Sequence, residues 1–134
     1  MQTIIIDATN ATLGRLASYA AKQSLLGNKI VILNSEKAIV TGKKGYTIQS
    51  YHKRSARGGS SQRGPFFQRN SEKIVKRTIR GMLPDYRSGK GKEAFKRIMC
   101  YRGVPEEYKG KKLIKAGKEK TTSYVSVGEI SSKI

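Results

Sequence analysis

Two short apolar runs stand near the start of the chain, Ile4-Ile5-Ile6 and residues 30–33, and polar residues interrupt neither of them. Such runs are typical of strands buried on both faces of a parallel sheet. Thr12 suits the start of an intervening helix, and Gly27-Asn28 suits its end. The small and apolar positions of that helix follow helical spacing at Leu13, Leu16, Ala17, Ala20, Ser24 and Leu25. Residues 3–33 therefore predict a βαβ unit.

A longer helical pattern later in the chain is broken in two. Residues 91–97 predict the second helix, which buries Ala94 and Phe95. Residues 71–82 predict the first helix, which Pro84 ends. The inward positions of this first helix are Ile74, Val75, Thr78, Ile79 and Met82.

Two further segments complete the expected sheet. Ala38-Ile39-Val40 predicts a short extended piece, and residues 98–101 predict another buried strand. Strands that alternate with helices predict a three-layer α/β/α fold, in which helices cover both faces of a small, mainly parallel sheet. A chain of 134 residues is long enough for one domain with a real core and too short for two. We therefore expect a single domain over residues 1–134.

The charge of the chain indicates the kind of partner. Lysine and arginine total 28 against 9 acidic residues, which gives a net charge of +19. Such self-repulsion predicts a polyanionic partner, and nucleic acid is the first candidate. Residues 43–120 hold 23 of the basic residues and 6 of the acidic ones. We expect the segments 43–69 and 86–120 to face RNA.

The rest of the composition argues against several classes of protein. No apolar run approaches the ~20 residues of a membrane span, and the N-terminus lacks a signal-peptide pattern. We therefore expect a cytoplasmic protein with no membrane partner. Cys100 is the only cysteine and His52 the only histidine, which excludes an internal disulfide and leaves no Cys/His cluster for zinc. We expect no metal and no cofactor.

The segment 53–69 alternates cations with small residues and ends beside Phe66-Phe67. Small residues let the backbone approach phosphates, and guanidinium groups can fork onto phosphate oxygens. A solvated basic loop is the alternative, but two aromatics that can stack on unpaired bases or anchor the loop favour RNA contact. With the two lysines before it, this segment offers as RNA-binding candidates Lys43, Lys44, Lys53, Arg54, Arg57, Arg63, Phe66, Phe67 and Arg69.

A second candidate surface lies on the predicted helices. Like charges at i, i+3, i+4 and i+7 share one helical face and repel one another by a few tenths of a kcal/mol per pair. A bound phosphate chain would reverse that cost, whereas a merely solvated face is the alternative. The candidates on the first helix are Lys73, Lys76, Arg77 and Arg80, and the adjoining stretch adds Arg87, Lys90, Lys92, Lys96 and Arg97.

Nucleotide binding and catalysis find little support in the sequence. The turn over 7–15 has one glycine where a dinucleotide-binding loop has three, and Gly42-Lys43 lacks the other residues of a phosphate-binding loop.

We expect Asp7 to cap the next helix or pair with a cation, and Cys100 to be a small core residue. The rival interpretations are an RNA-modifying or nucleotide-dependent enzyme and a basic protein that compacts nucleic acid. We expect no small-molecule substrate.

Several motifs occur along the chain in a fixed order. They are Ile6-Asp7-Ala8, Leu13-Gly14-Arg15-Leu16-Ala17-Ser18, Asn34-Ser35-Glu36-Lys37-Ala38, Arg77-Thr78-Ile79-Arg80-Gly81-Met82-Leu83-Pro84 and Tyr101-Arg102-Gly103-Val104-Pro105. By these motifs the chain resembles the universal large-subunit ribosomal protein 13 family from its first strand to its last few residues. The archaeal and eukaryotic branch is similar at Gly64-Pro65-Phe66-Phe67 and at Val127-Gly128-Glu129-Ile130, whereas Ser71 stands where the family often has proline.

The resemblance implies a three-layer α/β/α domain with a four-stranded parallel sheet, lodged among segments of large-subunit ribosomal RNA. It also implies neighbouring ribosomal proteins as partners, a part in early subunit assembly, and no catalytic activity. Arg77, Arg80 and the turn over 81–84 match the region that the family keeps near RNA. We therefore expect a structural constituent of the large ribosomal subunit that contributes to translation.

Overall fold

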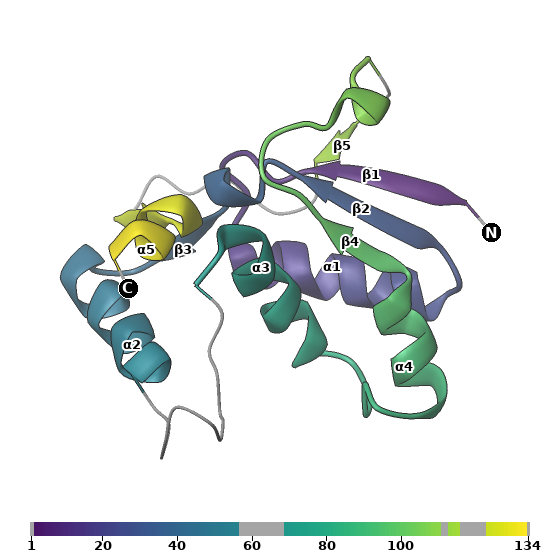
Figure 1. The fold of residues 1–134 in the computed structure, drawn as a ribbon, viewed down its shortest axis with the longest axis horizontal. Coiled ribbons are helices and arrows are strands. Elements are labelled where there is room, and N and C mark those ends of the chain that lie inside the picture. The colour runs from purple at the N-terminus through teal and green to yellow at the C-terminus, as the bar shows by residue number, and fades with distance from the viewer. Residues whose placement is uncertain (1, 57–68, 111–112, 116–122, 134) are drawn as a thin grey trace.

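The computed structural model describes residues 2–56, 69–110, 113–115 and 123–133 (Figure 1). Strands β4, β2, β1 and β5 form one sheet in that order, and β3 pairs with β6 in a second, smaller sheet. The elements are β1 (Thr3–Asp7), α1 (Leu13–Leu25), β2 (Lys29–Leu33), the 3-10 helix η1 (Ser35–Lys37), β3 (Ile39–Thr41), α2 (Lys44–Ala56), α3 (Ser71–Arg80), α4 (Gly89–Lys96), β4 (Ile98–Cys100), the 3-10 helix η2 (Glu106–Tyr108), β5 (Ile114–Lys115), β6 (Tyr124–Ser126) and α5 (Val127–Lys133).

The larger sheet is parallel throughout. β1 pairs with β2 over its whole length, and β4 and β5 add to the two sides of that pair. Ile6 and all of residues 30–33 are fully buried, and Ile4 and Ile5 are nearly so. These observations confirm the predicted α/β fold, a four-stranded parallel sheet, and the βαβ unit at its start. The extended piece that we expected at residues 38–40 does not complete this sheet: β3 pairs antiparallel with β6, and the short strand β5 is the fourth strand.

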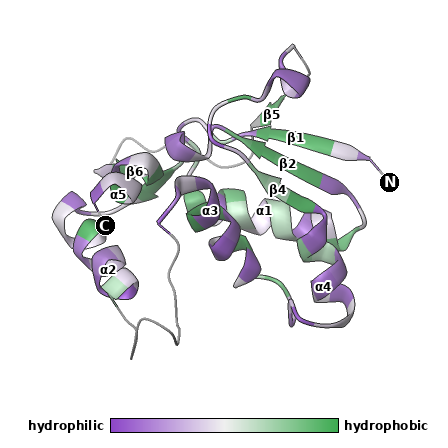
Figure 2. Cartoon of the chain, viewed as in Figure 1, coloured by the Kyte–Doolittle hydropathy of each residue, from purple (hydrophilic) through white to green (hydrophobic). Residues whose placement is uncertain are grey.

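Three helices cover one face of the sheet, namely α1, α3 and α4 (Figure 1). Ile6, Ile30 and Ile98 from three neighbouring strands lie in one buried cluster with Leu16 of α1 and Ile74 of α3. In Figure 2 the hydrophobic colour follows these strands and α1, whereas hydrophilic residues mark α3 and α4. Burial of each large aliphatic side chain contributes about 1.5–3 kcal/mol, so this face is the main source of stability.

The opposite face of the sheet is covered differently from our expectation. The rings of Tyr101 and Tyr108, with centroids 5.8 Å apart, pack there with Val104. In the described part of the chain, helices therefore cover one face, and the segment 101–108 covers the other. Two rings and a valine suffice because this face presents only three buried side chains, Ile5, Val31 and Leu33.

The predicted boundaries of α1 are confirmed. Thr12 occupies the N-cap position, and Gly27 follows the C-cap with φ +100°. The N–H of Gly27 donates to Ser24 O and that of Asn28 to Gln23 O, which is the hydrogen-bond pattern of a Schellman motif. A residue with a Cβ would be strained at the left-handed Gly27.

Several predicted inward positions are exposed or only partly buried, among them Leu25 at the end of α1, which is 40% exposed, and Thr78 of α3, which is partly buried. Met82 is 44% exposed because α3 ends at Arg80, before the chain reaches this methionine. Met99 is 38% exposed, since β4 lies at the edge of the sheet and not inside it. Phe95 is only partly buried, because its ring faces Tyr86 on the surface.

Helix α2 is absent from our prediction, which treated residues 53–69 as loop. Residues 53–56 are its last turn, and residues 57–68 lie outside the described residues. Only Thr47 is buried on α2, while Ile48 and Tyr51 are partly buried against the core. With so few inward positions, the helix leaves a weak periodic signal in the sequence.

Gly91 fixes the turn between α3 and α4. A Cβ at this position would lie 2.3 Å from the carbonyl oxygens of Pro84 and Asp85. We predict that Gly91→Ala lowers the free energy of unfolding by ~1–3 kcal/mol, because backbone must move to admit the methyl group. Urea titration followed by circular dichroism measures the change.

The matched control is Gly14→Ala in the first turn of α1, where a Cβ would meet no atom within 4 Å. This substitution is expected to be neutral or to stabilise the protein by ~0.4–1 kcal/mol. Equal stabilities for the two variants would contradict the close packing at Gly91.

Candidate nucleic-acid interface

The buried side of α3 determines where its cations point. Ile74, Val75 and Ile79 are at most 1% exposed, so the opposite side of the helix faces solvent. Lys73 and Arg77 are exposed there, and Lys76 and Arg80 are partly buried. The four predicted cations therefore share one face of α3, as their spacing indicates.

Aromatic residues join this face of α3 to the α4 region. The Lys76 ammonium lies 5.0 Å from the centroid of the Phe95 ring, and the Arg80 guanidinium lies 4.6 Å from that of Tyr86. Arg87 lies 5.3 Å from the same Tyr86 centroid. The two rings meet edge to face at 5.9 Å. We call this set the Tyr86 cluster, and its members are Lys76, Arg80, Tyr86, Arg87 and Phe95.

An open groove begins beside this cluster, between the end of α1 and the start of α4. Its volume is about 700 Å³. Arg87 lines both the groove and the Tyr86 cluster, so the two form one surface. The residues that line the groove are Leu25, Arg87, Ser88, Gly89, Lys90, Lys92, Glu93 and Arg97.

Arg97 has a structural task as well. Its Nη1 donates to the carbonyl oxygen of Ser24 at 2.9 Å, in the last turn of α1. The Ser24 carbonyl also accepts from Gly27 N–H, so the guanidinium is its second donor, and the positive charge complements the negative end of the helix dipole. Arg97 therefore connects α1 to the end of α4.

The lysines of this surface form no ion pair with an acidic residue in the described part of the chain. Within the described ranges, the ion pairs involve Lys44, Lys109 and Lys133. None of the lysines of α3 and α4, namely Lys73, Lys76, Lys90, Lys92 and Lys96, is among them. The surface is therefore a local excess of positive charge, which favours a polyanion.

The second group of candidates divides between α2 and undescribed residues. Lys43, Lys53 and Arg54 are exposed at or near the ends of α2, and the Arg54 guanidinium lies 4.9 Å from the centroid of the Tyr51 ring. Lys44 instead forms an ion pair with Glu129 of α5. The remaining candidates Arg57, Arg63, Phe66 and Phe67 lie outside the described residues, and Arg69 is exposed just before α3.

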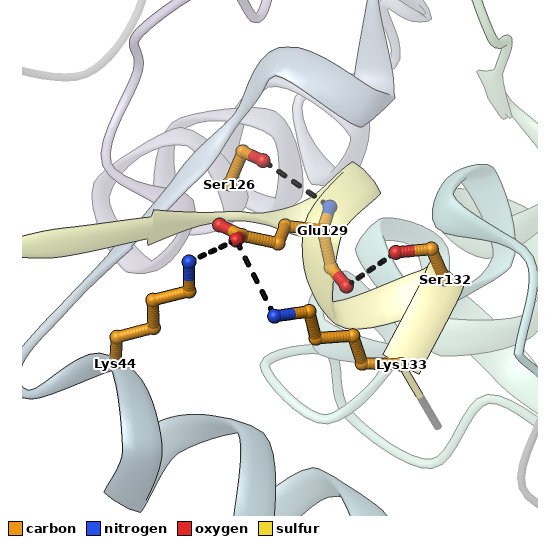
Figure 3. Close-up of polar contacts among 5 residues, drawn as sticks. All are labelled: Lys44, Ser126, Glu129, Ser132 and Lys133. Atoms are coloured by element: carbon orange, nitrogen blue, oxygen red, sulfur yellow. Dashed lines mark hydrogen bonds and ion pairs between the residues drawn. The ribbon is translucent and has the colours of Figure 1, made fainter.

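Helix α5 connects this group to the α3 region. Figure 3 shows Glu129 between Lys44 and Lys133, with its backbone N–H bonded to Ser126 Oγ. Ser131 Oγ donates to Arg69 O at 2.6 Å, so α5 contacts the chain on both sides of the segment 57–68. The pairing of Lys44 with Glu129 leaves no signal in the sequence, because the two residues are 85 positions apart.

The polar and reactive groups elsewhere have structural roles. Asp7 Oδ1 accepts hydrogen bonds from Thr9 N–H, Thr9 Oγ1 and Asn34 Nδ2, so it orders the turn after β1 instead of capping α1. Burial raises the pKa of the Cys100 thiol to about 12, so this thiol stays protonated at neutral pH. No three His, Cys, Asp or Glu residues within the described ranges could hold a metal ion together. No described helix is long and apolar enough to cross a membrane.

The fold and this surface define a class, the small basic α/β proteins that present a cationic helical face. Within that class, the chain belongs to the ribosomal protein L13 family, whose model matches residues 1–107. The large ribosomal subunit protein uL13 of Archaeoglobus fulgidus is 42% identical over 95% of this chain and 84% of its own length. The uL13 protein of Methanococcus maripaludis is 44% identical over 96% of this chain and 94% of its own length. That of Methanocaldococcus jannaschii is 42% identical over 97% of this chain and 96% of its own length.

These relatives confirm the resemblance that the sequence motifs indicate. They also confirm the expectation that the chain is not an enzyme, because members of this family are structural ribosomal proteins.

Glu129 offers a test of the contact between α2 and α5. Its hydrogen bond and ion pair with Lys44 hold the pKa of this carboxyl below its usual value of 4.5. We predict that Glu129→Gln unfolds at lower urea concentration than the wild type at pH 7. Because the folded-state pKa is the lower one, this stabilisation is fully present above about pH 4.5 and disappears as the pH falls through the folded-state pKa.

The matched control is Glu93→Gln, which removes the same charge from an exposed side chain of α4 that has no ion pair within the described ranges. Its urea midpoint is expected to stay close to that of the wild type at every pH. If Glu129→Gln shows the same stability difference at pH 7 and at pH 3, the charge of Glu129 is not what stabilises the contact.

Proposed function

We propose that this chain is a structural constituent of the large ribosomal subunit in the cytoplasm, where it binds ribosomal RNA and supports early assembly of the subunit. The observation that carries the proposal is the cationic face of α3 and α4, which has exposed lysines without acidic partners in the described ranges. Family membership and the names of the uL13 relatives agree with it. Its partners are large-subunit RNA and neighbouring ribosomal proteins.

In this proposal the buried sheet and α1 act as a rigid platform. The segments 43–69 and 86–120 pack against RNA and neutralise phosphates where RNA helices converge. Most of the residues that we assign to RNA contact are lysines and arginines, which bind phosphates, so recognition depends on the RNA backbone and its fold. The residues that we assign to RNA contact are Lys43, Lys44, Lys53, Arg54, Arg57, Arg63, Phe66, Phe67, Arg69, Lys73, Lys76, Arg77, Arg80, Arg87, Lys90, Lys92, Lys96 and Arg97.

Lys44, Lys76 and Arg97 already have partners inside the protein, at Glu129, Phe95 and Ser24. Each of these contacts leaves at least two N–H donors of the side chain for a phosphate, because an ammonium has three donors and a guanidinium five. These three residues therefore combine a structural contact with the proposed RNA contact.

A basic protein that compacts nucleic acid is the rival from another class. It would bind duplex DNA as readily as folded ribosomal RNA, because it would read charge alone. Exposed cations on one rigid helical face favour a partner of fixed shape instead.

The first prediction of this proposal concerns salt. Neutralisation of ~6–10 phosphates would reduce the affinity for large-subunit RNA by roughly three to five decades between low and moderate salt, by analogy with duplex DNA. Filter binding at several salt concentrations, with duplex DNA as a competitor, measures the slope and the preference. A flat salt response, or equal competition by DNA, would overturn the proposal.

The second prediction concerns the exposed lysines of the groove. Lys90→Gln with Lys92→Gln removes two groove charges and is expected to reduce the slope of log affinity against log salt by ~1–2. The matched control, Lys22→Gln with Lys29→Gln, removes two exposed charges from α1 and β2, outside the proposed RNA-facing segments. If both double variants change the slope equally, the groove has no special role in RNA contact.

A further inference from the structure

We propose that Tyr86 is a positioning residue, which holds the guanidinium groups of Arg80 and Arg87 at one ring as a site for phosphates of one RNA strand. This inference rests on the proposed function and names the part of the surface that is arranged before RNA arrives. Tyr86 is not among the candidates that sequence analysis selected.

The geometry brings two cations from different elements to one ring. Arg80 is the last residue of α3, and Arg87 lies in the turn before α4. The Arg80 guanidinium carbon is 4.6 Å from the ring centroid of Tyr86, and that of Arg87 is 5.3 Å away. Arg87 Nε also donates to the hydroxyl of Tyr86 at 3.2 Å. The ring attracts both charges, and the hydroxyl directs one of them.

Tyr86 is itself held in place. Its ring meets Phe95 edge to face at 5.9 Å, and Lys76 lies on Phe95 from the side of α3. The turn that carries Tyr86 is ordered by Asp85, which accepts hydrogen bonds from Arg87 N–H and Ser88 Oγ. A positioned side chain loses less rotamer freedom when a ligand binds, so the arginines of this cluster are partly preorganised.

The charges of this site remain available for a ligand. Neither arginine forms an ion pair within the described ranges, and Asp85 is occupied by the hydrogen bonds of its own turn. A guanidinium has five N–H donors in a planar fork. Arg87 donates one of them to Tyr86, which leaves its terminal nitrogens free to fork onto a phosphate.

The two charges are close enough to contact one nucleic-acid strand. Two guanidinium carbons at these distances from one centroid lie no more than about 10 Å apart, and a strand of a duplex presents a phosphate every ~3.4 Å along its axis. Arg87 also lines the groove with Lys90 and Lys92, so cations continue beyond the pair. One strand can therefore pass from Arg80 over Tyr86 to Arg87 and into the groove.

Tyr86→Leu tests the proposal because it removes both the ring and the hydroxyl. The full-length chain is titrated with transcribed large-subunit ribosomal RNA at several salt concentrations, and thermal unfolding is measured alongside. We expect the variant to lose roughly 10-fold in affinity, and the slope of log affinity against log salt to fall by ~1. A purely structural role for Tyr86 would lower the melting temperature and leave the slope unchanged.

Tyr86→Phe separates the two contacts. It keeps the ring under Arg80 and loses the hydroxyl that accepts from Arg87, so we expect roughly half of the logarithmic loss seen with leucine. In a background of Arg80→Met with Arg87→Met, Tyr86→Leu should cause no further loss, because Tyr86 acts through these arginines. Tyr124→Leu on β6 is the matched control, since Tyr124 is 49% exposed and lies outside both proposed RNA-facing segments.

The outcomes separate this inference from the proposed function. If the wild type binds ribosomal RNA with a steep salt dependence and Tyr86→Leu binds equally well, the positioning role is overturned and the proposed function stands. If the wild type itself shows no salt-dependent binding, the proposed function fails. If Tyr86→Leu is unfolded at the assay temperature, Tyr86→Phe is the deciding variant. The inference is overturned if Tyr86→Phe binds RNA with the affinity of the wild type while Arg87→Met binds more weakly.

Discussion

The packing of α3 against α1 and the sheet is the contact on which the rest of the surface depends. Ile74, Val75 and Ile79 are nearly or fully buried, and each contributes about 1.5–3 kcal/mol by leaving water. The helix cannot rotate without exposing them, so its cations must face solvent. The same constraint fixes Arg80 at the end of α3, from where it reaches Tyr86. The buried apolar residues of α3 therefore determine which way its cations face.

The packing of α3 brings several positive charges close together, although these charges repel one another. A net charge of +19 on 134 residues destabilises any compact state, and the buried face of the sheet must outweigh that repulsion. Aromatic rings reduce the local cost, because Lys76, Arg80 and Arg87 each lie near a ring whose face attracts cations. A polyanion would remove the remaining repulsion. In our proposal, the stability of the fold and the binding of RNA are therefore coupled through the same side chains.

The parts of the fold that the sequence predicted are those in which one physical signal dominates. The runs at 4–6 and 30–33 are buried on both faces, so they contain no polar residue to obscure a strand. Gly27 marks the end of α1 because its left-handed backbone disfavours other residues. Helix α2 escaped prediction because it buries a single residue, Thr47, and its remaining pattern is that of a polar loop. The sequence also did not predict how the face of the sheet opposite α1 is covered. Two tyrosines and a valine suffice there in place of a helix, because few apolar side chains on this face need cover.

The candidate surface was predictable as a set of cations but not as a geometry. Helical spacing places Lys73, Lys76, Arg77 and Arg80 on one face without any knowledge of the fold. The role of Tyr86 depends on a turn that brings the end of α3 beside the start of α4, and that turn is set by Gly91 against the carbonyls of Pro84 and Asp85. Nothing in the sequence around Gly91 indicates that this glycine brings Arg80 and Arg87 together. The spacing of cations along the chain can therefore indicate which residues favour RNA, whereas tertiary packing determines which of them lie close together.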